Sequence, residues 1–392
     1  MQAPGFIGFS KEHLLITIAD FPQHKKLSKK QVQHNENLAE KYNPQGYFPH
    51  VLLVDDQGKV LSEIITNRVD AENVIAQIKP YLALTELEEF SASLLLMGSS
   101  FQITLVAEKN TGAAFLTEAI NKIQSIESWL SSWQEGSITT RLNREAAKHP
   151  VQVSPAYFKL VKRCLELSKL TQGAFDISFN GLGSLYKFDQ QEHDLPSSQA
   201  LIESIKHVGY DKIVLDDDQR ISFSDSLVRI GFGAIGKGYA AEQVKKLMEA
   251  RGLPGGVVNA SGDLTTWGTR ASGEPWKIGV PEPQNKDNII LWLPVEGKAI
   301  ATSGDYEKYF TFEGKKYSHI INPKTGLPVV GASSVSIISD SAELSDALAT
   351  AVSVMGIEVG MNLINQLEGV ECVFIDNNRK LHFSNGLQAY AY

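Results

Sequence analysis

The spacing of apolar and polar positions predicts four long helices between residues 111 and 356. Residues 111–133 and 154–173 place apolar side chains three and four positions apart, as an amphipathic helix does. The segment 239–252 repeats this pattern and closes on Gly252, and the segment 341–356 is also helical in pattern. Ser154-Pro155 predicts a capped helix start. Strand patterns occupy the intervals between these helices, beginning with LLLMGSSFQITLVAE.

Residues 13–82 form a separate pattern. HLLITIADF predicts a strand, NENLAEKYNP a helix, HVLLVDDQGKVLSEII a hairpin and DAENVIAQIKPYL a closing helix capped by Asp70. This order, with Phe48-Pro49 before the hairpin, resembles the C-terminal part of a thioredoxin fold. The first strand and the CxxC helix of that family are missing, so the resemblance implies a docking or vestigial domain without thiol chemistry.

The predicted organisation is therefore α+β with two domains. A partial thioredoxin-like α/β domain covers residues 1–84, a linker covers 85–93 within LTELEEFSAS, and a larger domain covers 94–392. A chain of 392 residues is long enough for roughly two to three domains. We find no internal repeat.

Composition and charge narrow the functional classes. The chain is 43% hydrophobic and 21% charged, which is typical of a globular protein, and its net charge of -8 argues against nucleic acid as a partner. No apolar run reaches the ~18 residues of a spanning helix. The start, MQAPGFIGFSKEH, has no signal-peptide pattern and no lipid-acceptor cysteine. We expect a soluble chain, either as synthesised or as a mature form.

The two cysteines predict no redox or metal chemistry. Cys164 lies in a helical pattern and Cys372 in a strand pattern, and neither has a CxxC neighbour. We expect both to be buried free thiols.

A glycine-rich loop precedes the helix at 239–252. LVRIGFGAIGKGYAAEQ contains the GxGxxG spacing of a dinucleotide fingerprint and most of a P-loop. A P-loop requires Ser or Thr where this chain has Gly238, and the dinucleotide motif requires an acid earlier than Asp263. A glycine turn entering a helix still offers N–H groups and a positive dipole end to a phosphate, and Lys237 adds a cation. The alternative is an ordinary strand-to-helix turn.

Two strand ends and one helix carry further candidate chemistry. Ser-Gly-Asp follows a short strand at 261–263 and again at 303–305, which suits either ligand contact or ordinary turns. Asp346 and Thr350 are four residues apart, so their oxygens share one face of a helix. Carboxylate and hydroxyl oxygens suit a hard cation such as Mg²⁺, although a polar surface position is the simpler interpretation.

The ordered motifs resemble the ApbE family of FAD:protein FMN transferases. They are MGSS, SITTRLN, GAFDIS, GAIGKGYA, VNASGDL, PWKIGV, ATSGDYEKYF, SHIINPKTGLPV and SDALATAVSVMG, across about residues 94–390. The resemblance implies that FAD and Mg²⁺ bind and that FMN moves onto a Ser or Thr hydroxyl of a target protein as a phosphoester, with release of AMP. It also implies a periplasmic or extracytoplasmic location, with the cytoplasm as the alternative because no signal pattern is present.

The resemblance assigns roles to individual positions. Asp346 and Thr350 match the magnesium ligands, and Ala234 matches the position that supplies a backbone carbonyl. His319 matches the family histidine implicated in the chemistry, as a base for the target hydroxyl. The implied flavin-nucleotide contacts are Met97, Gly98, Asn143, Phe175, Asp176, Lys237, Ser261, Gly262, Asp263, Ser303, Gly304 and Asp305.

Three positions depart from the family pattern. Ser261 replaces a glycine, Asn322 replaces an aspartate before Pro323, and Asp176-Ile177-Ser178 replaces Asp-Pro-Thr. Two alternatives therefore stay open: an FAD diphosphatase giving FMN and AMP, and an FAD-binding protein without turnover. The implied partner is a separate acceptor, a redox subunit with a [Ser/Thr]-Gly-Ala-[Ser/Thr] site, because Thr111-Gly112-Ala113 in this chain is followed by Ala114.

Overall fold

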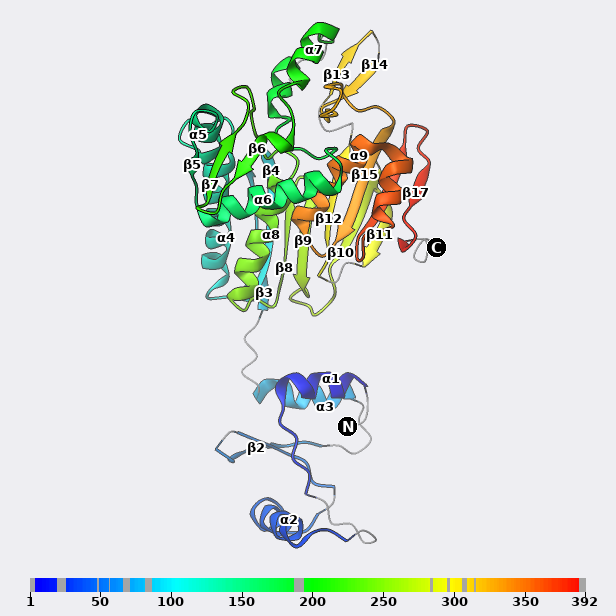
Figure 1. The fold of residues 1–392 in the computed structure, drawn as a ribbon. Helices are drawn as coiled ribbons and strands as arrows, with labels where there is room; N and C mark the ends of the chain where they lie inside the picture. Colours follow the sequence, from blue (N-terminus) through cyan, green and yellow to red (C-terminus); the bar gives the residue numbers. More distant parts are fainter. Residues whose placement is uncertain are drawn as a thin grey trace. The chain divides into compact units, whose positions relative to one another are not determined.

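The chain divides into two compact units, Met1–Glu86 and Leu87–Tyr392 (Figure 1). The computed structural model describes residues 4–19, 26–47, 49–55, 57–65, 71–81, 87–186, 194–282, 285–294, 297–304, 309–313 and 315–387.

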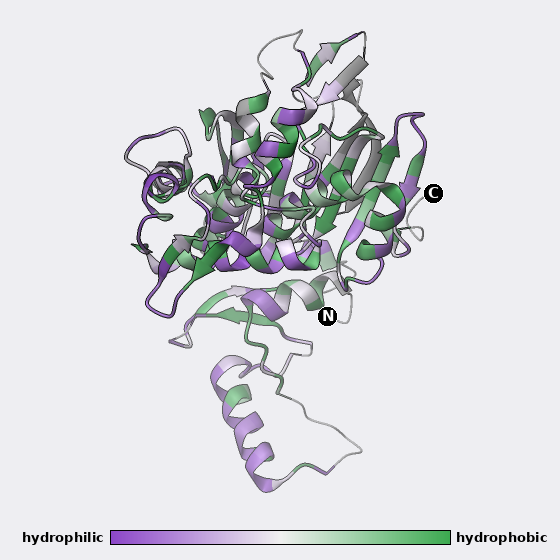
Figure 2. Ribbon diagram, turned by 45° about the horizontal axis from the view of Figure 1, so that its top comes forward, coloured by the Kyte–Doolittle hydropathy of each residue, from purple (hydrophilic) through white to green (hydrophobic). Residues whose placement is uncertain are grey.

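The N-terminal unit has a small core between two helices and a hairpin. Phe6 of the first helix, Ile64 beside the hairpin, and Val74 and Ile78 of the third helix are its buried apolar residues. The second helix is almost entirely hydrophilic and buries only Asn35 (Figure 2). The elements are α1 (Pro4–His13), α2 (Lys29–Tyr42), β1 (Leu52–Val54), β2 (Val60–Glu63), α3 (Ala71–Ile78) and η1 (Lys79–Tyr81).

The sequence interpretation of this unit is only partly correct. The β1–β2 hairpin and the helices on either side of it form as expected. The expected strand HLLITIADF is wrong, because His13 ends α1 and residues 14–19 form no strand, with Leu15 98% exposed. An apolar segment becomes a strand only where a neighbour takes its backbone hydrogen bonds. The thioredoxin resemblance is therefore not confirmed; Phe48 and Asp70 lie outside the described residues.

The C-terminal unit is built on an eight-stranded sheet whose neighbouring strands are all antiparallel. Its spatial order is β17-β16-β15-β12-β9-β8-β4-β3. The strands are β3 (Leu87–Leu96), β4 (Ser99–Glu108), β8 (Gly255–Ala260), β9 (Asp263–Gly268), β12 (Ala299–Gly304), β15 (Ala332–Ser339), β16 (Glu371–Asp376) and β17 (Leu381–Phe383).

The predicted linker at 85–93 is wrong for residues 87–93, which are the first part of β3. Leu87 pairs with Glu108, so β3 and β4 form one long hairpin. Met97 and Gly98 make its turn with φ values of 52° and 68°. A two-residue hairpin turn of this hand requires positive φ, which explains the glycine inside the predicted strand.

Helices pack against the sheet and form the core together with its strands. α4, α8 and α9 contact successive strands and one another. Successive residues of a strand face opposite sides: Ala301 packs with α9, whereas Ile300 packs with Ile278 and Ile338 on the other side. The helices are α4 (Gly112–Leu130), α5 (Ile138–Glu145), α6 (Pro155–Leu170), η2 (Asn180–Leu185), α7 (Ser198–Ile205), η3 (Tyr210–Lys212), α8 (Gly236–Ala250) and α9 (Ala342–Ile364).

The predicted helices are confirmed with shifted ends. Ser154 caps α6 by accepting the N–H of Tyr157. α9 extends past the predicted end at Gly356, which has φ 76° and kinks the helix. By length and composition α9 could cross a membrane, but it packs on β12, β15 and α8, and its buried apolar residues belong to the core.

Three small sheets extend the unit and support its loops: β5 (Val151–Gln152) with β6 (Ile213–Leu215) and β7 (Arg220–Phe223), β10 (Lys277–Glu282) with β11 (Asn285–Pro294), and β13 (Tyr309–Phe312) with β14 (Lys315–Ser318). The β13–β14 hairpin leads directly to His319. Its Phe310 is fully buried in a satellite core with Leu182, Tyr186 and Ile321.

Candidate active site

One edge of the large sheet gathers most of the predicted positions. The β3–β4 turn, the β8–β9 turn and the end of β12 lie at this edge, because Phe101 pairs with Ala260 and β12 pairs antiparallel with β9. α8 begins at this edge too, since an added Cβ on Gly236 would meet the Met97 side chain at 3.3 Å. The strand-end motifs are therefore neighbours in space.

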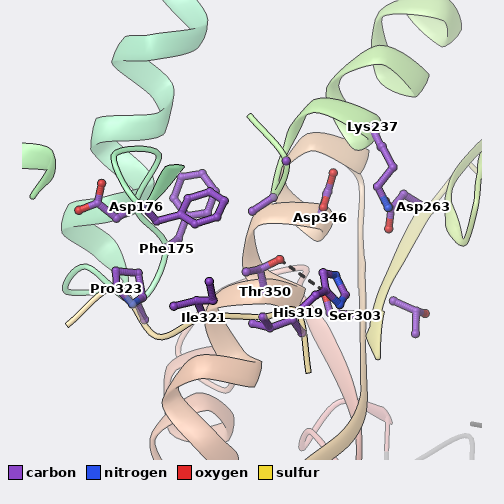
Figure 3. A pocket seen from close by; sticks show the side chains of 16 residues that line it. Phe175, Asp176, Lys237, Asp263, Ser303, His319, Ile321, Pro323, Asp346 and Thr350 are labelled. Atoms are coloured by element: carbon purple, nitrogen blue, oxygen red, sulfur yellow. Dashed lines mark hydrogen bonds and ion pairs between the residues drawn. The ribbon is translucent and has the colours of Figure 1, made fainter. Parts of the chain in front are cut away.

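A cavity of about 150 Å³ opens at this edge (Figure 3). Figure 3 shows side chains from α8, α9, β9, β12 and the His319 loop converging on it, with Phe175 and Asp176 on the side away from Lys237 and Asp263. The lining residues are Ala174, Phe175, Asp176, Phe179, Gly233, Ala234, Lys237, Asp263, Thr302, Ser303, His319, Ile320, Ile321, Pro323, Asp346 and Thr350.

The glycine-rich loop brings α8 and α9 into close contact. Gly238 donates its N–H to Oδ2 of Asp346 at 2.9 Å. A Cβ on Gly238 would lie 2.2 Å from the carbonyl oxygen of Ala342 and 2.7 Å from the Cβ of Asp346. The Ser or Thr of a P-loop cannot fit at this position, so the structure supports the exclusion of that motif. A glycine is required here because α8 and α9 cross so closely that no side chain fits between them.

Asp346 and Thr350 face the cavity from consecutive turns of α9. Asp346 is 4% exposed, and its Gly238 hydrogen bond fixes the carboxylate beside the N-terminus of α8. The Thr350 hydroxyl lies 3.4 Å from the hydroxyl of Ser303 at the end of β12. The predicted spacing therefore does place both oxygens on one face, and that face lines the cavity.

Lys237 and Asp263 form an ion pair inside the cavity. Nζ of Lys237 lies 2.6 Å from Oδ2 of Asp263, which is 2% exposed. Burial raises the pKa of the Asp263 carboxyl, and the Lys237 ammonium opposes that shift. An ammonium held at a helix N-terminus adds to the positive potential there, which favours an anionic ligand.

The GAFDIS segment forms the opposite side of the cavity. The Asp176 carboxylate accepts the N–H and hydroxyl of Ser178 at 2.8 and 2.7 Å, and the N–H of Tyr210 at 2.8 Å. Burial raises the pKa of Asp176, although these hydrogen bonds act to lower it. Ser178 also accepts the N–H of Gly209 at 2.7 Å, so the departure from the family threonine preserves a hydroxyl that is in use.

The loop that carries His319 is a tight hairpin. Asn322 accepts the N–H of Lys324 through its side-chain oxygen at 2.9 Å, and its own N–H donates to the carbonyl of Leu327 at 2.9 Å. The amide oxygen thus closes the turn, as a carboxylate oxygen at this position could. The hydroxyl of Tyr186 donates to the carbonyl of Gly326 at 2.7 Å and anchors the loop to the satellite core.

Several predicted contacts lie outside the cavity lining. Asn143 exchanges two hydrogen bonds with the backbone of Ile230, at 2.9 and 2.8 Å, and so holds the segment directly before the glycine loop. Ser261 has φ 55° and bonds to the backbone of Ser100, so serine adopts the left-handed conformation expected for the family glycine. The positions at the edge but outside the lining are Met97, Gly98, Ser261, Gly262 and Gly304; Asp305 lies outside the described residues.

The donor set fits a magnesium ion that substrate oxygens help to bind. Within the described ranges, no cluster of three or more His, Cys, Asp or Glu side chains is arranged to hold a metal ion. A single carboxylate, a hydroxyl and Ala234 nonetheless border the same cavity. Mg²⁺ is commonly held by one or two carboxylates together with substrate phosphates, so this set suits it when a phosphate-bearing ligand is present.

Some lining residues carried no chemical signal in the sequence. Thr302, Ile320 and Ile321 flank predicted motifs and reach the cavity only because those motifs do. Phe179 lies three residues beyond Asp176 and belongs to the same turn. Nearness to a motif was the one available signal for all four.

The fold and the cavity together define an α+β protein with a site suited to an anionic nucleotide and a hard cation. Residues 97–374 match the model of the ApbE family, and the chain belongs to that family.

Known relatives agree with this assignment. FAD:protein FMN transferases of Klebsiella pneumoniae and Salmonella typhimurium are 27% and 28% identical, over 69% and 71% of this chain and 79% and 82% of their own. The crystal structure of the ApbE protein of Thermotoga maritima superposes with a TM-score of 0.72 at 28% identity and covers 78% of this chain and all of that one. The flavin transferase ApbE of Vibrio cholerae shares the fold, with a TM-score of 0.70 at 24% identity, over 77% of this chain and 99% of its own.

Proposed function

We propose that this protein is a magnesium-dependent FAD:protein FMN transferase that forms a phosphoester with a Ser or Thr hydroxyl of a separate protein and releases AMP. The observation that carries the proposal is the convergence of Lys237, Asp346, Thr350 and His319 on one cavity, in a chain whose relatives bear that name. Within the described residues, the sequence predicts an anion site, hard oxygen donors and an imidazole together only at this cavity.

The diphosphate of FAD would lie at the N-terminus of α8. Lys237 and the first N–H groups of that helix offer positive charge to phosphate oxygens. Phe175, which is 1% exposed, borders the other side of the cavity with an almost fully buried ring. Asp346, Thr350 and Ala234 are the residues that would hold Mg²⁺ against the diphosphate. The bound ion would neutralise phosphate charge and stabilise the leaving AMP.

His319 would prepare the acceptor. An alcohol is a weak nucleophile at neutral pH, and an imidazole within reach can accept its proton as the new bond forms. The acceptor oxygen would form a bond to the FMN phosphorus while the bond from that phosphorus to the oxygen shared with AMP breaks. The proton would pass to His319, and AMP would leave with the former bridging oxygen. The Tyr186 and Asn322 hydrogen bonds would keep the imidazole in place during this step.

The acceptor is proposed to be another protein with a [Ser/Thr]-Gly-Ala-[Ser/Thr] site. In this chain Thr111 precedes α4, and Gly112, Ala113 and Ala114 form its first turn. Residue 114 has no hydroxyl to modify, so the chain does not offer itself as a substrate at this position. The proposal also gives this protein an extracytoplasmic location.

Mass spectrometry of an acceptor protein tests the proposal. The chain would be incubated with FAD, Mg²⁺ and an acceptor domain bearing the site, and the acceptor should gain the mass of FMN while AMP appears in equal amount. Asp346→Ala and His319→Ala should each lower the rate about 100-fold or more. Glu358→Ala is the matched control, because this exposed acid lies on the same helix as Asp346.

The products separate the alternatives. AMP released at the same rate without any acceptor would replace the proposal with FAD hydrolysis. Tight FAD binding with no AMP in either reaction, on an acceptor that another transferase modifies, would replace it with a binding role.

A further inference from the structure

One buried carboxylate of α8 caps the start of α9. Ser341 is the N-cap residue of α9, and its hydroxyl accepts the N–H of Leu344 at 3.2 Å. The same hydroxyl donates to Oε2 of Glu242, which lies on α8. Oε2 of Glu242 also accepts the N–H of Glu343 at 3.1 Å. Glu242 therefore satisfies an N-terminal donor of α9 from outside that helix, which the sequence of α9 alone cannot show.

Glu242 keeps its charge in this environment. It is 8% exposed, and Nζ of Lys246, one turn along α8, lies 2.5 Å from its Oε1. Burial acts to raise the pKa of Glu242, but hydrogen bonds from Lys246, Ser341 and Glu343 together hold it below its ordinary value. A carboxylate is stabilised at the positive end of a helix, so the charge of Glu242 stabilises the start of α9 in addition to its hydrogen bonds.

The same face of α8 contacts α9 twice. Gly238 and Glu242 are four residues apart, and therefore lie one above the other on that face. Gly238 donates to the Asp346 carboxylate, and Glu242 accepts the N–H of Glu343, three residues before Asp346. These two contacts fix where α9 starts and how it is rotated against α8. The places of Asp346 and Thr350 in the cavity follow from that register.

We propose that Glu242 is a positioning residue for the magnesium site: it fixes the start of α9 against α8 and so sets where Asp346 and Thr350 present their oxygens. The proposal rests on the proposed function, which gives those two residues their role. Glu242 does not line the cavity, so it acts through α9. Loss of a residue that orients metal ligands commonly weakens metal affinity about 10- to 100-fold.

Magnesium titration of variants tests this role. Glu242→Gln keeps the shape of the side chain and removes its charge, and Ser341→Ala removes only the bridging hydroxyl. The matched control is Glu249→Gln, because Glu249 is an exposed acid on the same helix. The full-length chain is saturated with FAD, and its Mg²⁺ affinity is measured by calorimetry. Both variants should bind Mg²⁺ about tenfold or more weakly than the wild type does. The control should bind Mg²⁺ within about twofold of the wild type. The affinity of each chain for FAD without Mg²⁺ should also stay within about twofold of the wild-type value.

The magnesium dependence of the reaction separates positioning from simple destabilisation. If Glu242 positions the ligands, the variants need more Mg²⁺ for half-maximal FMN transfer but recover most of the rate at saturating Mg²⁺. A rate loss that no Mg²⁺ concentration restores, with unchanged Mg²⁺ affinity and a lower Tm, would overturn the proposal and leave Glu242 a stabilising residue only. If Glu242→Gln does not fold, Ser341→Ala decides between these results.

The failure of the proposed function looks different. A wild-type chain that binds FAD but no Mg²⁺ would overturn the metal site and this inference together. Wild-type binding of Mg²⁺ with unchanged binding by both variants would overturn this inference alone.

Discussion

At the scale of single residues, the cavity contains groups whose environments differ sharply from water. Asp263 and Asp176 are both buried carboxylates with raised pKa values, but only Asp263 has an ammonium beside it. The Lys237 ammonium compensates Asp263 in the protein, and under the proposed function it would also attract phosphate. A buried carboxylate is costly mainly when its partner is removed.

The Lys237–Asp263 pair predicts a non-additive pair of mutations. Lys237→Ala should destabilise the chain by about 3 kcal/mol, because Asp263 loses its cation. Asp263→Ala added to it should recover part of that loss, since no charge is then left buried. Urea unfolding of the wild type, both single variants and the double variant measures the coupling. Two independent losses that simply add would show that the pair does not act as a unit.

At the scale of elements, the active site depends on how α8 crosses α9 and on how the His319 loop is anchored. The crossing needs a glycine at position 238, and the loop needs a hydrogen bond from Tyr186. Each contact joins segments more than 100 residues apart in sequence. Each can be broken by changing a single atom or group.

Gly238→Ala should separate α8 from α9. The new methyl group would overlap the Ala342 carbonyl and the Asp346 side chain, and overpacking of this kind costs about 1–3 kcal/mol. We expect a lower Tm together with weaker binding of Mg²⁺. Gly233→Ala is the control within the same loop, because the nearest atom to its Cβ, on Phe179, is 4.0 Å away. Equal Tm values for the two variants would contradict the crossing argument.

Tyr186→Phe should lose stability in a pH-dependent way. Burial raises the pKa of Tyr186 to about 12 from its ordinary 10.0, so the folded state retains the hydroxyl proton that the unfolded chain releases. The wild type should therefore be more stable than the variant below pH 10, and this advantage should shrink as the pH rises from 10 to 12. Denaturant unfolding at pH 8, 10 and 11.5 measures the difference between the two chains, in which the other tyrosines cancel.

At the scale of the whole molecule, the family match and the proposed site residues all lie in the C-terminal unit. The match covers residues 97–374, and the unit begins at Leu87 with the first residue of β3. The N-terminal unit has its own small core in Phe6, Ile64, Val74 and Ile78. The two units therefore have separate cores.

A chain that begins at Leu87 should fold and remain active. We expect its FAD affinity and its rate of FMN transfer to a short acceptor peptide to stay within about threefold of the full chain, because every proposed site residue is retained. Circular dichroism, FAD titration and the mass assay check this together. A second chain beginning at Ser91 is the control: it removes four residues of β3 and should lose stability. Aggregation of the chain that begins at Leu87 would show that the N-terminal unit completes the fold.

The sequence determined the local chemistry of this protein. Helix spacing, the Ser154 cap and the order of the short motifs depend on neighbours within a few residues, and the structure reproduces the cap and the helices. The α+β class and the spacing of Asp346 and Thr350 followed from the same local rules.

Only the tertiary structure decided which of these groups meet. It placed Lys237 on Asp263, directed Asn143 to the backbone of Ile230 and made Glu242 the cap of another helix. It also showed that residues 14–19 of HLLITIADF form no strand and that residues 87–93 of the predicted linker belong to β3. The strands of the sheet and the Glu242 cap of α9 each need a partner that is distant in sequence, and a periodic pattern carries no information about which distant segment becomes that partner.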